Sequence, residues 1–317
     1  NKILVEGLEI SLDDASSELC FVSHAHSDHI SAFKQNKKII ASEETFELLE
    51  RKMQLINLPK KLALYPAGHM LGARQLMANL DGERFVYTGD FSLHGSYTYP
   101  PAPILECDTL MIDSTYALPN LCFPKRQYVL ERMRKFVLQN ENSIILFGAY
   151  TKGKAQELIS FLNTECKIAP VIPQNTAKIC EKYKKFGIKL DYIEIGTPEA
   201  EEQMNSSFVA ILPPNKVNFE FASKLSWAHN REVKTAIATG WAKISRFPVD
   251  AAFAFSDHAD FKDTLNYIYE SGAKKVICAN ANQEAAAFYL RKVGINASAK
   301  TSKRQEKDLK QQVLFDF

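Results

Sequence analysis

The chain lacks a charge excess of either sign and any paired-cysteine motif. Its 317 residues carry 39 basic and 37 acidic side chains, so its net charge of +2 excludes a strong overall attraction to nucleic acid, and any such binding must be local. No CxxC spacing occurs among the six cysteines, which predicts reduced, mostly buried thiols in an intracellular protein. These residues are Cys20, Cys107, Cys122, Cys166, Cys180 and Cys278.

The chain also lacks a long apolar run. No stretch approaches the roughly 20 residues needed to span a bilayer, and residues 1–10 do not have the pattern of a signal peptide. We therefore expect a cytoplasmic protein. A hydrophobic content of 46% over 317 residues is sufficient for one or two packed cores.

One segment resembles a P-loop but lacks the Ser or Thr hydroxyl that such a loop requires. Residues 148–155 read GAYTKGKA. A Walker A loop needs Ser or Thr after its Lys to bind magnesium, whereas Ala155 follows Lys154 here. A strand end followed by basic residues and a helix start still suits phosphate groups, so Lys152 and Lys154 are candidates for contacts with a nucleic-acid backbone. The alternative, that both are solvated surface lysines, stays open.

Potential metal ligands are densest at residues 24–29, which read HAHSDH directly behind the apolar run Leu19–Val22. An extended segment projects alternate side chains to one side, so His24 and His26 are placed to bind one cation. Asp28 and His29 follow one turn further on and are placed to face a second cation. Four ligand-type side chains in so short a segment favour a metal site over isolated histidines.

Two later residues are candidates to complete this site. His69 and Asp90 each follow a Gly just past an apolar, strand-like run. The intervening Asp81-Gly82 pair predicts a hairpin turn, which brings Asp90 to a strand end where its carboxylate would bridge two cations. Asp13 precedes the cluster by about one strand and is better placed to orient a ligand His than to bind metal.

These residues resemble the signature of the metallo-β-lactamase superfamily, HxHxDH followed by a later His and a bridging Asp. The resemblance implies an αββα sandwich with a dinuclear zinc site and leaves the substrate open. Asp113-Ser114-Thr115-Tyr116 and residues 255–260 (FSDHAD) each follow an apolar strand and resemble motifs A and B of the β-CASP nucleases. The strings GHMLGARQ, TGDFS, DSTYALP, KGKAQ, GWAKISR and FSDHADF are most similar, in this order, to the ligase-associated, crosslink-repair-like exonucleases, also described as mRNA 3′-end processing factor-like.

The middle of the chain alternates between strand and helix patterns, which predicts a parallel sheet covered by helices. Helices are predicted at about 125–138, 155–162, 177–185 and 219–227, and strands at 144–147, 170–172, 192–195 and 208–212. This alternation resembles a short β-CASP insert in an α/β fold. The predicted division is a metallo-β-lactamase N-terminal part at 1–118, the insert at 119–235, the C-terminal part at 236–299 and a basic tail at 300–317.

One position departs from the RNA-processing β-CASP pattern. Asn280 stands where those enzymes carry a His that binds the second metal. A carboxamide oxygen is a poor zinc ligand beside an imidazole, so a weaker second site is expected. The DNA-directed crosslink-repair branch resembles this chain in lacking that His, which favours DNA as the substrate.

The chemistry that the resemblance implies is metal-assisted hydrolysis of phosphodiester bonds. One Zn²⁺ would be held tightly by His24, His26 and His69, and a labile second ion, Zn²⁺, Mn²⁺ or Mg²⁺, would lie at Asp28 and His29 with Asp90 between the two. Zinc in such a site makes water a nucleophile near neutral pH.

Three residues are assigned to catalysis: Asp28, Asp113 and His258. The resemblance gives His258 contact with the scissile phosphate or protonation of the leaving oxygen. Asp113 would hold the His258 imidazole in one tautomer and favour its charged form.

The predicted function is a metal-dependent nuclease, a DNA exonuclease in repair or replication-linked processing. An RNA-processing ribonuclease shares every ligand and is the main alternative. A non-catalytic nucleic-acid-binding subunit has no need for a complete ligand set, and a small-molecule hydrolase has no need for the DSTY and FSDHAD motifs.

The tail changes character from basic and polar to apolar. Its last residues, QQVLFDF, resemble the short peptides by which DNA enzymes bind sliding clamps. In such a peptide a Gln fills a small polar pocket while an aliphatic residue and aromatics fill an apolar one. The predicted clamp-binding residues are Gln311, Leu314, Phe315 and Phe317; a frayed tail or a packed final strand is the alternative.

Overall fold

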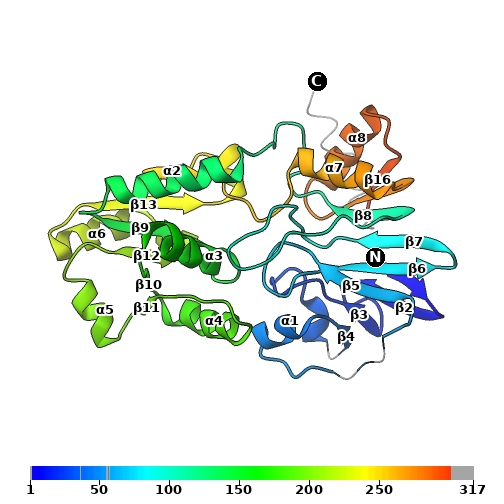
Figure 1. The fold of residues 1–317 in the computed structure, drawn as a ribbon, viewed down its shortest axis with the longest axis horizontal. Helices are drawn as coiled ribbons and strands as arrows, with labels where there is room; N and C mark the ends of the chain where they lie inside the picture. The colour runs from blue at the N-terminus through cyan, green and yellow to red at the C-terminus, as the bar shows by residue number, and fades with distance from the viewer. Residues whose placement is uncertain (1, 36, 55, 57, 301–317) are drawn as a thin grey trace.

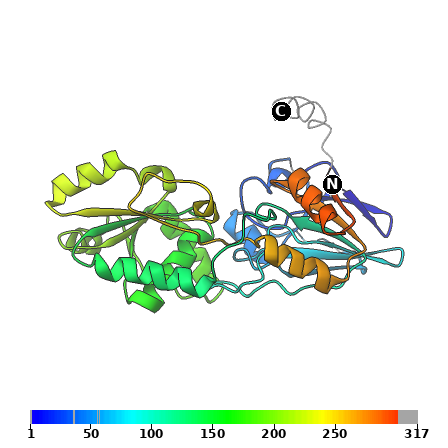
Figure 2. The same ribbon diagram turned by 90° about the horizontal axis from the view of Figure 1, so that it is seen from above.

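The computed structural model describes residues 2–300 apart from 36, 55 and 57. The predicted clamp-binding residues lie outside this range. The described chain folds into two bodies that lie side by side (Figures 1 and 2). Within the described residues, no helix combines the length and apolar character needed to cross a membrane.

The first body contains two sheets that pack face to face. The smaller sheet has the order β1 (Lys2–Val5), β2 (Leu8–Leu12), β3 (Leu19–Phe21) and β4 (Lys38–Ile40). The larger sheet has the order β16 (Ala297–Ala299), β15 (Lys275–Ala279), β8 (Thr109–Asp113), β7 (Glu83–Tyr87), β6 (Arg74–Leu80) and β5 (Leu62–Pro66). Alternation along the strands places Ile10, Phe21, Leu76 and Tyr87 in one buried apolar layer between the sheets.

Helices cover the outer faces of both sheets. α7 (Phe261–Ser271) and α8 (Gln283–Lys292) pack on the larger sheet, where Ile268 and Leu290 join the same core as Ile112. The short helices η1 (Ser31–Lys34) and α1 (Glu43–Leu48) cover the smaller sheet through a cluster that includes Phe46 and Val22. The predicted hairpin is present, since β6 and β7 pair antiparallel with Leu80 opposite Glu83.

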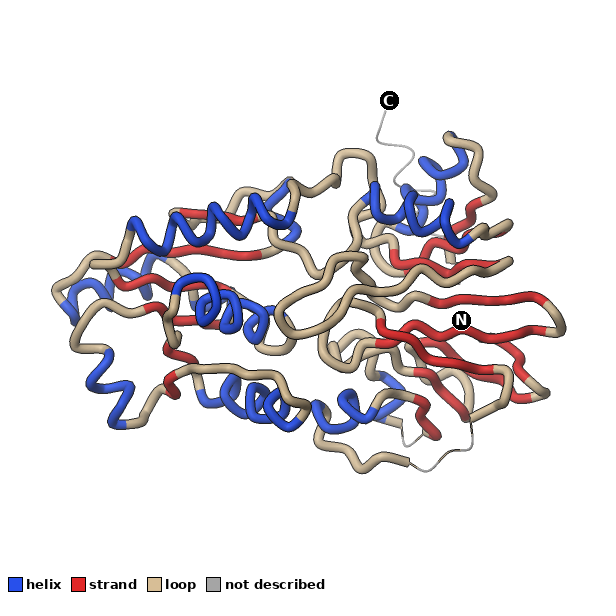
Figure 3. Tube along the Cα trace, in the orientation of Figure 1, coloured by secondary structure: helices blue, strands red, loops and turns tan. Residues whose placement is uncertain are grey.

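The second body is a six-stranded sheet with every pair parallel, flanked by helices (Figure 3). Its strand order is β11 (Ile193–Glu194), β10 (Val171–Ile172), β12 (Val209–Leu212), β9 (Ile144–Gly148), β13 (Val233–Ala238) and β14 (Ala251–Phe253). Its helices are α2 (Arg126–Gln139), α3 (Lys154–Phe161), α4 (Gln174–Lys185), α5 (Pro198–Gln203) and α6 (Phe219–His229), with the short η2 (Leu162–Cys166), η3 (Pro214–Lys216) and η4 (Gly240–Lys243). The predicted α/β character, with a parallel sheet covered by helices, is confirmed.

The structure moves the predicted end of the insert. Residue 236 was the expected return point to the first body, yet β13 and β14 belong to the sheet of the second body. β13 pairs along its length with β9, and its buried residues Ala236 and Ala238 contribute to the core there. The chain therefore leaves the second body only after Phe253, because β13 pairs with β9 and β14 pairs with β13.

The two bodies are joined at several points. The crossing segments before α2 and before α7 are tied together where Phe123 N–H donates to the Asp260 carboxylate at 2.7 Å. On the other side, Lys185 of α4 pairs with Glu47 of α1, and Lys182 of α4 pairs with Glu50, just after α1. A continuous buried core also runs through both bodies. These contacts hold the second body in place against the strand ends of the first body.

Candidate metal centre

Three imidazole rings converge at the strand ends that face the second body. His24 and His26 follow β3, and His69 follows β5. His26 Nδ1 lies 3.0 Å from His24 Nε2 and 3.1 Å from His69 Nε2. Ligand nitrogens on one tetrahedral zinc ion are about 3.3 Å apart, given Zn–N distances of about 2.0–2.1 Å. The inner nitrogens of the three rings are therefore nearly as far apart as the ligand nitrogens of one zinc ion.

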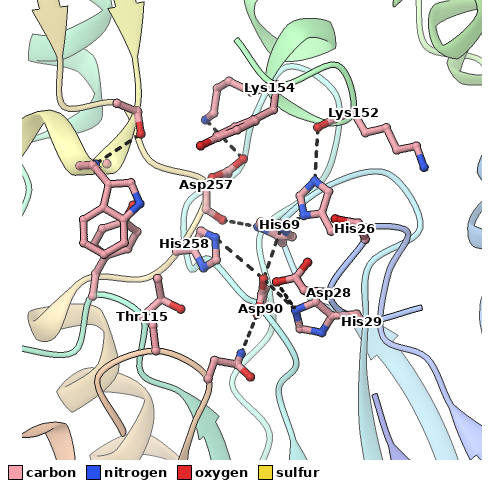
Figure 4. Close-up of a pocket in the computed structure, with 18 of the residues that line it drawn as sticks. His26, Asp28, His29, His69, Asp90, Thr115, Lys152, Lys154, Asp257 and His258 are labelled. Atoms are coloured by element: carbon pink, nitrogen blue, oxygen red, sulfur yellow. Dashed lines mark hydrogen bonds and ion pairs between the residues drawn. The ribbon is translucent and has the colours of Figure 1, made fainter. Parts of the chain in front are cut away.

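A carboxylate completes this group. Asp90, just past the end of β7, places Oδ2 3.6 Å from His24 Nε2. The same oxygen lies 3.8 Å from His69 Nε2 (Figure 4). The ligand-type atoms of His24, His26, His69 and Asp90 all lie within 4.8 Å of one another. Three nitrogens and one oxygen in this arrangement match the donor set that zinc takes in proteins.

The outer nitrogen of each ring is fixed by a hydrogen bond. His26 Nε2–H donates to the Lys152 carbonyl at 3.3 Å, and His69 Nδ1–H donates to the Asp257 carbonyl at 3.0 Å. Ser23 Oγ donates to Asp13, so it accepts from His24 Nδ1–H at 2.9 Å. With these protons placed outside, the lone pairs of all three inner nitrogens point at the shared centre.

The pKa values of the three rings agree with this assignment. Burial away from water holds the pKa of His24 well below its usual value and lowers the pKa of His26 to about 4. Burial also lowers the pKa of His69. Each ring is therefore neutral near pH 7, which is the form that binds a cation, and the residues present fit a divalent metal ion.

A second group of ligand-type residues lies beside the first. His29 Nε2 is 3.5 Å from both Asp28 Oδ2 and Asp90 Oδ2. Burial opposes a positive charge on His29, but Asp13 and Asp90 outweigh that effect and raise its pKa. The same carboxylates would attract a cation. The side chain of Asp28 is 77% exposed, so this second position is more open than the first.

Asp13 has the orienting position expected from the sequence. Its Oδ2 accepts a 2.7 Å hydrogen bond from His29 Nδ1–H and a 2.8 Å bond from the Tyr87 hydroxyl. Its other oxygen accepts from Ser23 N–H at 2.6 Å. Asp13 thus directs His29 Nε2 inward without itself facing the cluster.

Asn280 lies at the end of β15 and donates from Nδ2 to two carboxylates, Asp90 at 2.7 Å and Asp113 at 3.0 Å. The amide therefore acts as a hydrogen-bond donor between two acids at the position where a His was expected in the RNA-processing pattern. A donor directed at Asp90 stabilises its carboxylate but supplies no lone pair to a cation.

His258 and Asp113 form the pair that their motifs predicted. His258 Nδ1–H donates to Asp113 Oδ2 at 2.8 Å, and Asp113 is held in turn by the Thr115 N–H and hydroxyl. Burial opposes protonation of His258, but Asp90 and Asp113 outweigh it and raise its pKa to about 9. His258 Nε2 lies 3.9 Å from Asp90 Oδ2, so a charged N–H group borders the cluster.

The two lysines predicted to contact a phosphate backbone differ. Lys152 lies on the wall of the pocket, half-buried, with Nζ 3.4 Å from the Ala25 carbonyl. Lys154 is buried, and its ammonium pairs with Glu157 at 2.9 Å and with Asp257 at 3.5 Å. Lys154 also lines the pocket, but the start of α3 packs between the two bodies, where two carboxylates already pair with its charge.

Several pocket residues were not predicted from the sequence. The pocket has a volume of about 810 Å³ and reaches across both bodies. Asp257 orients His69 through its carbonyl, and its place inside the FSDHAD motif, next to His258, was the only signal for it. Trp241 and Tyr116 lie within two strings that were used only as marks of resemblance, and Tyr150 lies within the P-loop-like string.

Several known proteins are similar in sequence to this chain. No protein-family model matches the chain. A probable DNA ligase of Opitutus terrae is 29% identical over 302 residues, covering 88% of this chain and 28% of that protein. An RNase J-like protein of Methanocaldococcus jannaschii is 29% identical over 189 residues, covering 48% of this chain and 45% of that protein. The human DNA cross-link repair 1A protein is 27% identical over 295 residues, covering 81% of this chain and 27% of that protein.

The chain thus spans less than half the length of each of these relatives. A crystal structure of an Enterococcus faecalis protein of unknown function is similar in fold, with a TM-score of 0.57 and 15% identity, and the match covers 84% of this chain and 76% of the other. The chain is similar to members of the metallo-β-lactamase/β-CASP family. This similarity extends to proteins named for DNA ligation, DNA cross-link repair and RNase J.

Proposed function

We propose that the protein is a metal-dependent nuclease that hydrolyses phosphodiester bonds, and specifically a DNA exonuclease in repair or replication-linked processing. The observation that carries this proposal is the meeting of two groups in one pocket. The neutral imidazoles and Asp90 form one group, and the charged His258 with Asp113 forms the other. We assign the layered first body to the αββα sandwich of the family and the second to its β-CASP insert.

The candidate ligands would hold two metal ions. His24, His26 and His69, with Asp90, would hold a zinc ion, while Asp28 and His29 would hold a second ion that shares Asp90. A divalent cation so held supplies Lewis-acid activation of water and of the phosphate. Bringing these side chains to one side of the pocket orients the phosphodiester before reaction.

His258 would act on the far side of the phosphate. Its Nε2–H faces the pocket, and its raised pKa keeps this proton in place at neutral pH. The proton can form a charge-assisted hydrogen bond to a phosphate oxygen or pass to the leaving oxygen. Asp113 holds the ring in the tautomer that makes either action possible.

DNA is preferred as the substrate on two grounds. One is the similarity to proteins named for DNA ligation and DNA cross-link repair, which covers more than 80% of this chain. The other is Asn280, which donates to Asp90 where an RNA-processing enzyme would present a His ligand. An RNA-processing ribonuclease is the second candidate, favoured by the RNase J-like relative.

End-labelled single strands test this function directly. DNA and RNA of equal sequence, labelled at either end, are incubated with the protein and zinc, manganese or magnesium. We expect DNA to be degraded progressively, and a chelator to stop the reaction. Faster cleavage of RNA would support the ribonuclease instead, and absence of cleavage with every metal would contradict a nuclease.

The position of Asn280 predicts unequal binding of two metals. After dialysis against a mild chelator, the protein should retain about one equivalent of metal, because a carboxamide is a poor substitute for an imidazole ligand. Asn280→His should retain a second equivalent. Elemental analysis measures both values.

Asn230→His is the matched control for this experiment. Asn230 shares the left-handed backbone conformation of Asn280 but lies at the end of α6, in the second body. The control should behave like the unmodified protein. Two tightly held equivalents in the unmodified protein would show that another residue completes the second position, and the argument for DNA would lose the support of Asn280.

We also propose a cytoplasmic location and binding of a sliding clamp through Gln311, Leu314, Phe315 and Phe317. Both proposals rest on the sequence pattern alone.

A further inference from the structure

A row of aromatic rings leads outward from the candidate metal centre. The Tyr116 ring meets the His258 ring edge-on, with centroids 5.6 Å apart, and the centroid of the Trp241 ring lies 4.8 Å from that of Tyr116. Tyr116 is buried, whereas Trp241 is half-buried and lines the pocket. The indole is therefore the outer, accessible member of the row.

The backbone fixes Trp241 in this position. The backbone N–H of Trp241 donates to the Thr239 hydroxyl, which caps η4 directly after β13. A Cβ atom at Gly240 would lie 2.7 Å from the Tyr116 ring, so only glycine permits the chain to approach that ring so closely. The indole is thus preorganised against Tyr116 before any ligand arrives.

The charged groups of the pocket would act on the phosphate and leave the base without a partner. A metal ion held by the three imidazoles and Asp90 would attract phosphate oxygens, and His258 would add a charged N–H group. The other ionic side chains offer the base little, since Asp28 and Asp257 are acids and Lys154 is already paired with Glu157 and Asp257. An aromatic surface supplies the missing contact, because it binds any base through its π-face without regard to sequence.

We propose that Trp241, supported from behind by Tyr116, is the residue on which the nucleobase beside the scissile phosphate stacks. This inference rests on the proposed nuclease function. A base stacked on the indole must be unpaired, so the substrate is a single strand, and a strand without a base at that position binds poorly. Tyr150, which is 62% exposed on the pocket wall, offers a second ring for the adjoining base.

Abasic oligonucleotides test the inference. The probes are ten-nucleotide phosphorothioate strands of DNA and of RNA, either intact or with one abasic nucleotide at the 5′ or the 3′ end. Fluorescence anisotropy measures their affinity in the presence of metal. We expect one abasic end to weaken binding to the unmodified protein by about tenfold or more, and the sensitive end identifies the end that enters the pocket.

Substitutions complete a double-mutant cycle. Trp241→Ala should weaken binding of the intact strand to the same extent, and the abasic strand should then bind no more weakly than the intact one. Trp241→Phe should retain most of the affinity. Trp227→Ala is the matched control, because Trp227 is 87% exposed on α6, outside the pocket, and its loss should change nothing.

A spectroscopic readout is also available. The chain has two tryptophans, so Trp227→Phe leaves Trp241 as the only indole, and its fluorescence should be quenched by the intact strand and not by the sensitive abasic strand. Equal binding of intact and abasic strands by the unmodified protein, with cleavage preserved, would overturn the stacking role and leave the nuclease standing. Failure to bind or cleave any strand would overturn both.

Discussion

Replacement of His26 by Ala or of Asp90 by Asn is expected to lower the rate of phosphodiester cleavage by about 10³-fold or more. His26 Nδ1 lies at the centre of the cluster, within 3.1 Å of the inner nitrogens of both His24 and His69. Asp90 is the only carboxylate in that group. Either change removes charge stabilisation of the transition state rather than apolar packing, so the fold should persist. Single-turnover kinetics measure the cleavage rate, elemental analysis measures the metal content, and circular dichroism measures whether the fold persists.

His229→Ala is the control for these variants. Of the seven histidines, His229 lies in the last turn of α6 in the second body, with no part in the cluster. Its loss should leave cleavage and metal content unchanged. If His26→Ala and Asp90→Asn both cleave at nearly the original rate with unchanged metal content, the assignment of the metal centre is wrong.

Glu157→Gln is expected to lower the free energy of unfolding by about 3 kcal/mol or more. The Glu157 carboxylate is fully buried between two cations, Arg126 of α2 and Lys154 of α3. Both cations also flank the ring of Phe255, at 4.4 and 4.5 Å, in the segment that returns to the first body. Removing this carboxylate takes away the ion-pair partner of Arg126 and leaves Lys154 only the more distant Asp257, at 3.5 Å, which costs far more than the lost contact itself. Urea unfolding monitored by circular dichroism measures the change.

An exposed ion pair provides the comparison for Glu157. Glu220 pairs with Lys224 one helical turn away in α6, with side chains 79% and 73% exposed. Glu220→Gln should therefore change the stability by less than about 0.5 kcal/mol. If Glu157→Gln lowers the free energy of unfolding by less than about 1 kcal/mol, water must solvate Lys154 and Arg126, or another carboxylate must pair with them. This network would then not hold the two bodies together.

Local pattern was sufficient for much of the metal centre. Ligands such as His24 and Asp90 directly follow buried strands, and a strand end fixes the direction of the next few residues from local geometry alone. The Asp81-Gly82 turn likewise placed Asp90 correctly, because a two-residue hairpin has few possible geometries. The α/β alternation of the second body was predictable for the same reason, since each helix and strand carries its own period of apolar residues.

Other features depend on contacts between segments far apart in the sequence, and only the tertiary structure decides them. The sequence could not show that Lys154 is buried against Asp257, because α3 and the segment after β14 meet only when the two bodies pack. The same holds for β14, whose three residues gain their place in a sheet only from pairing with β13.

The orienting groups are long-range as well: the Asp257 carbonyl that fixes His69 lies 188 residues along the chain from it. Residue type and spacing therefore determined which side chains are candidate metal ligands. Packing of the second body against the first decided how those side chains are aimed, and which aromatic rings stand beside them.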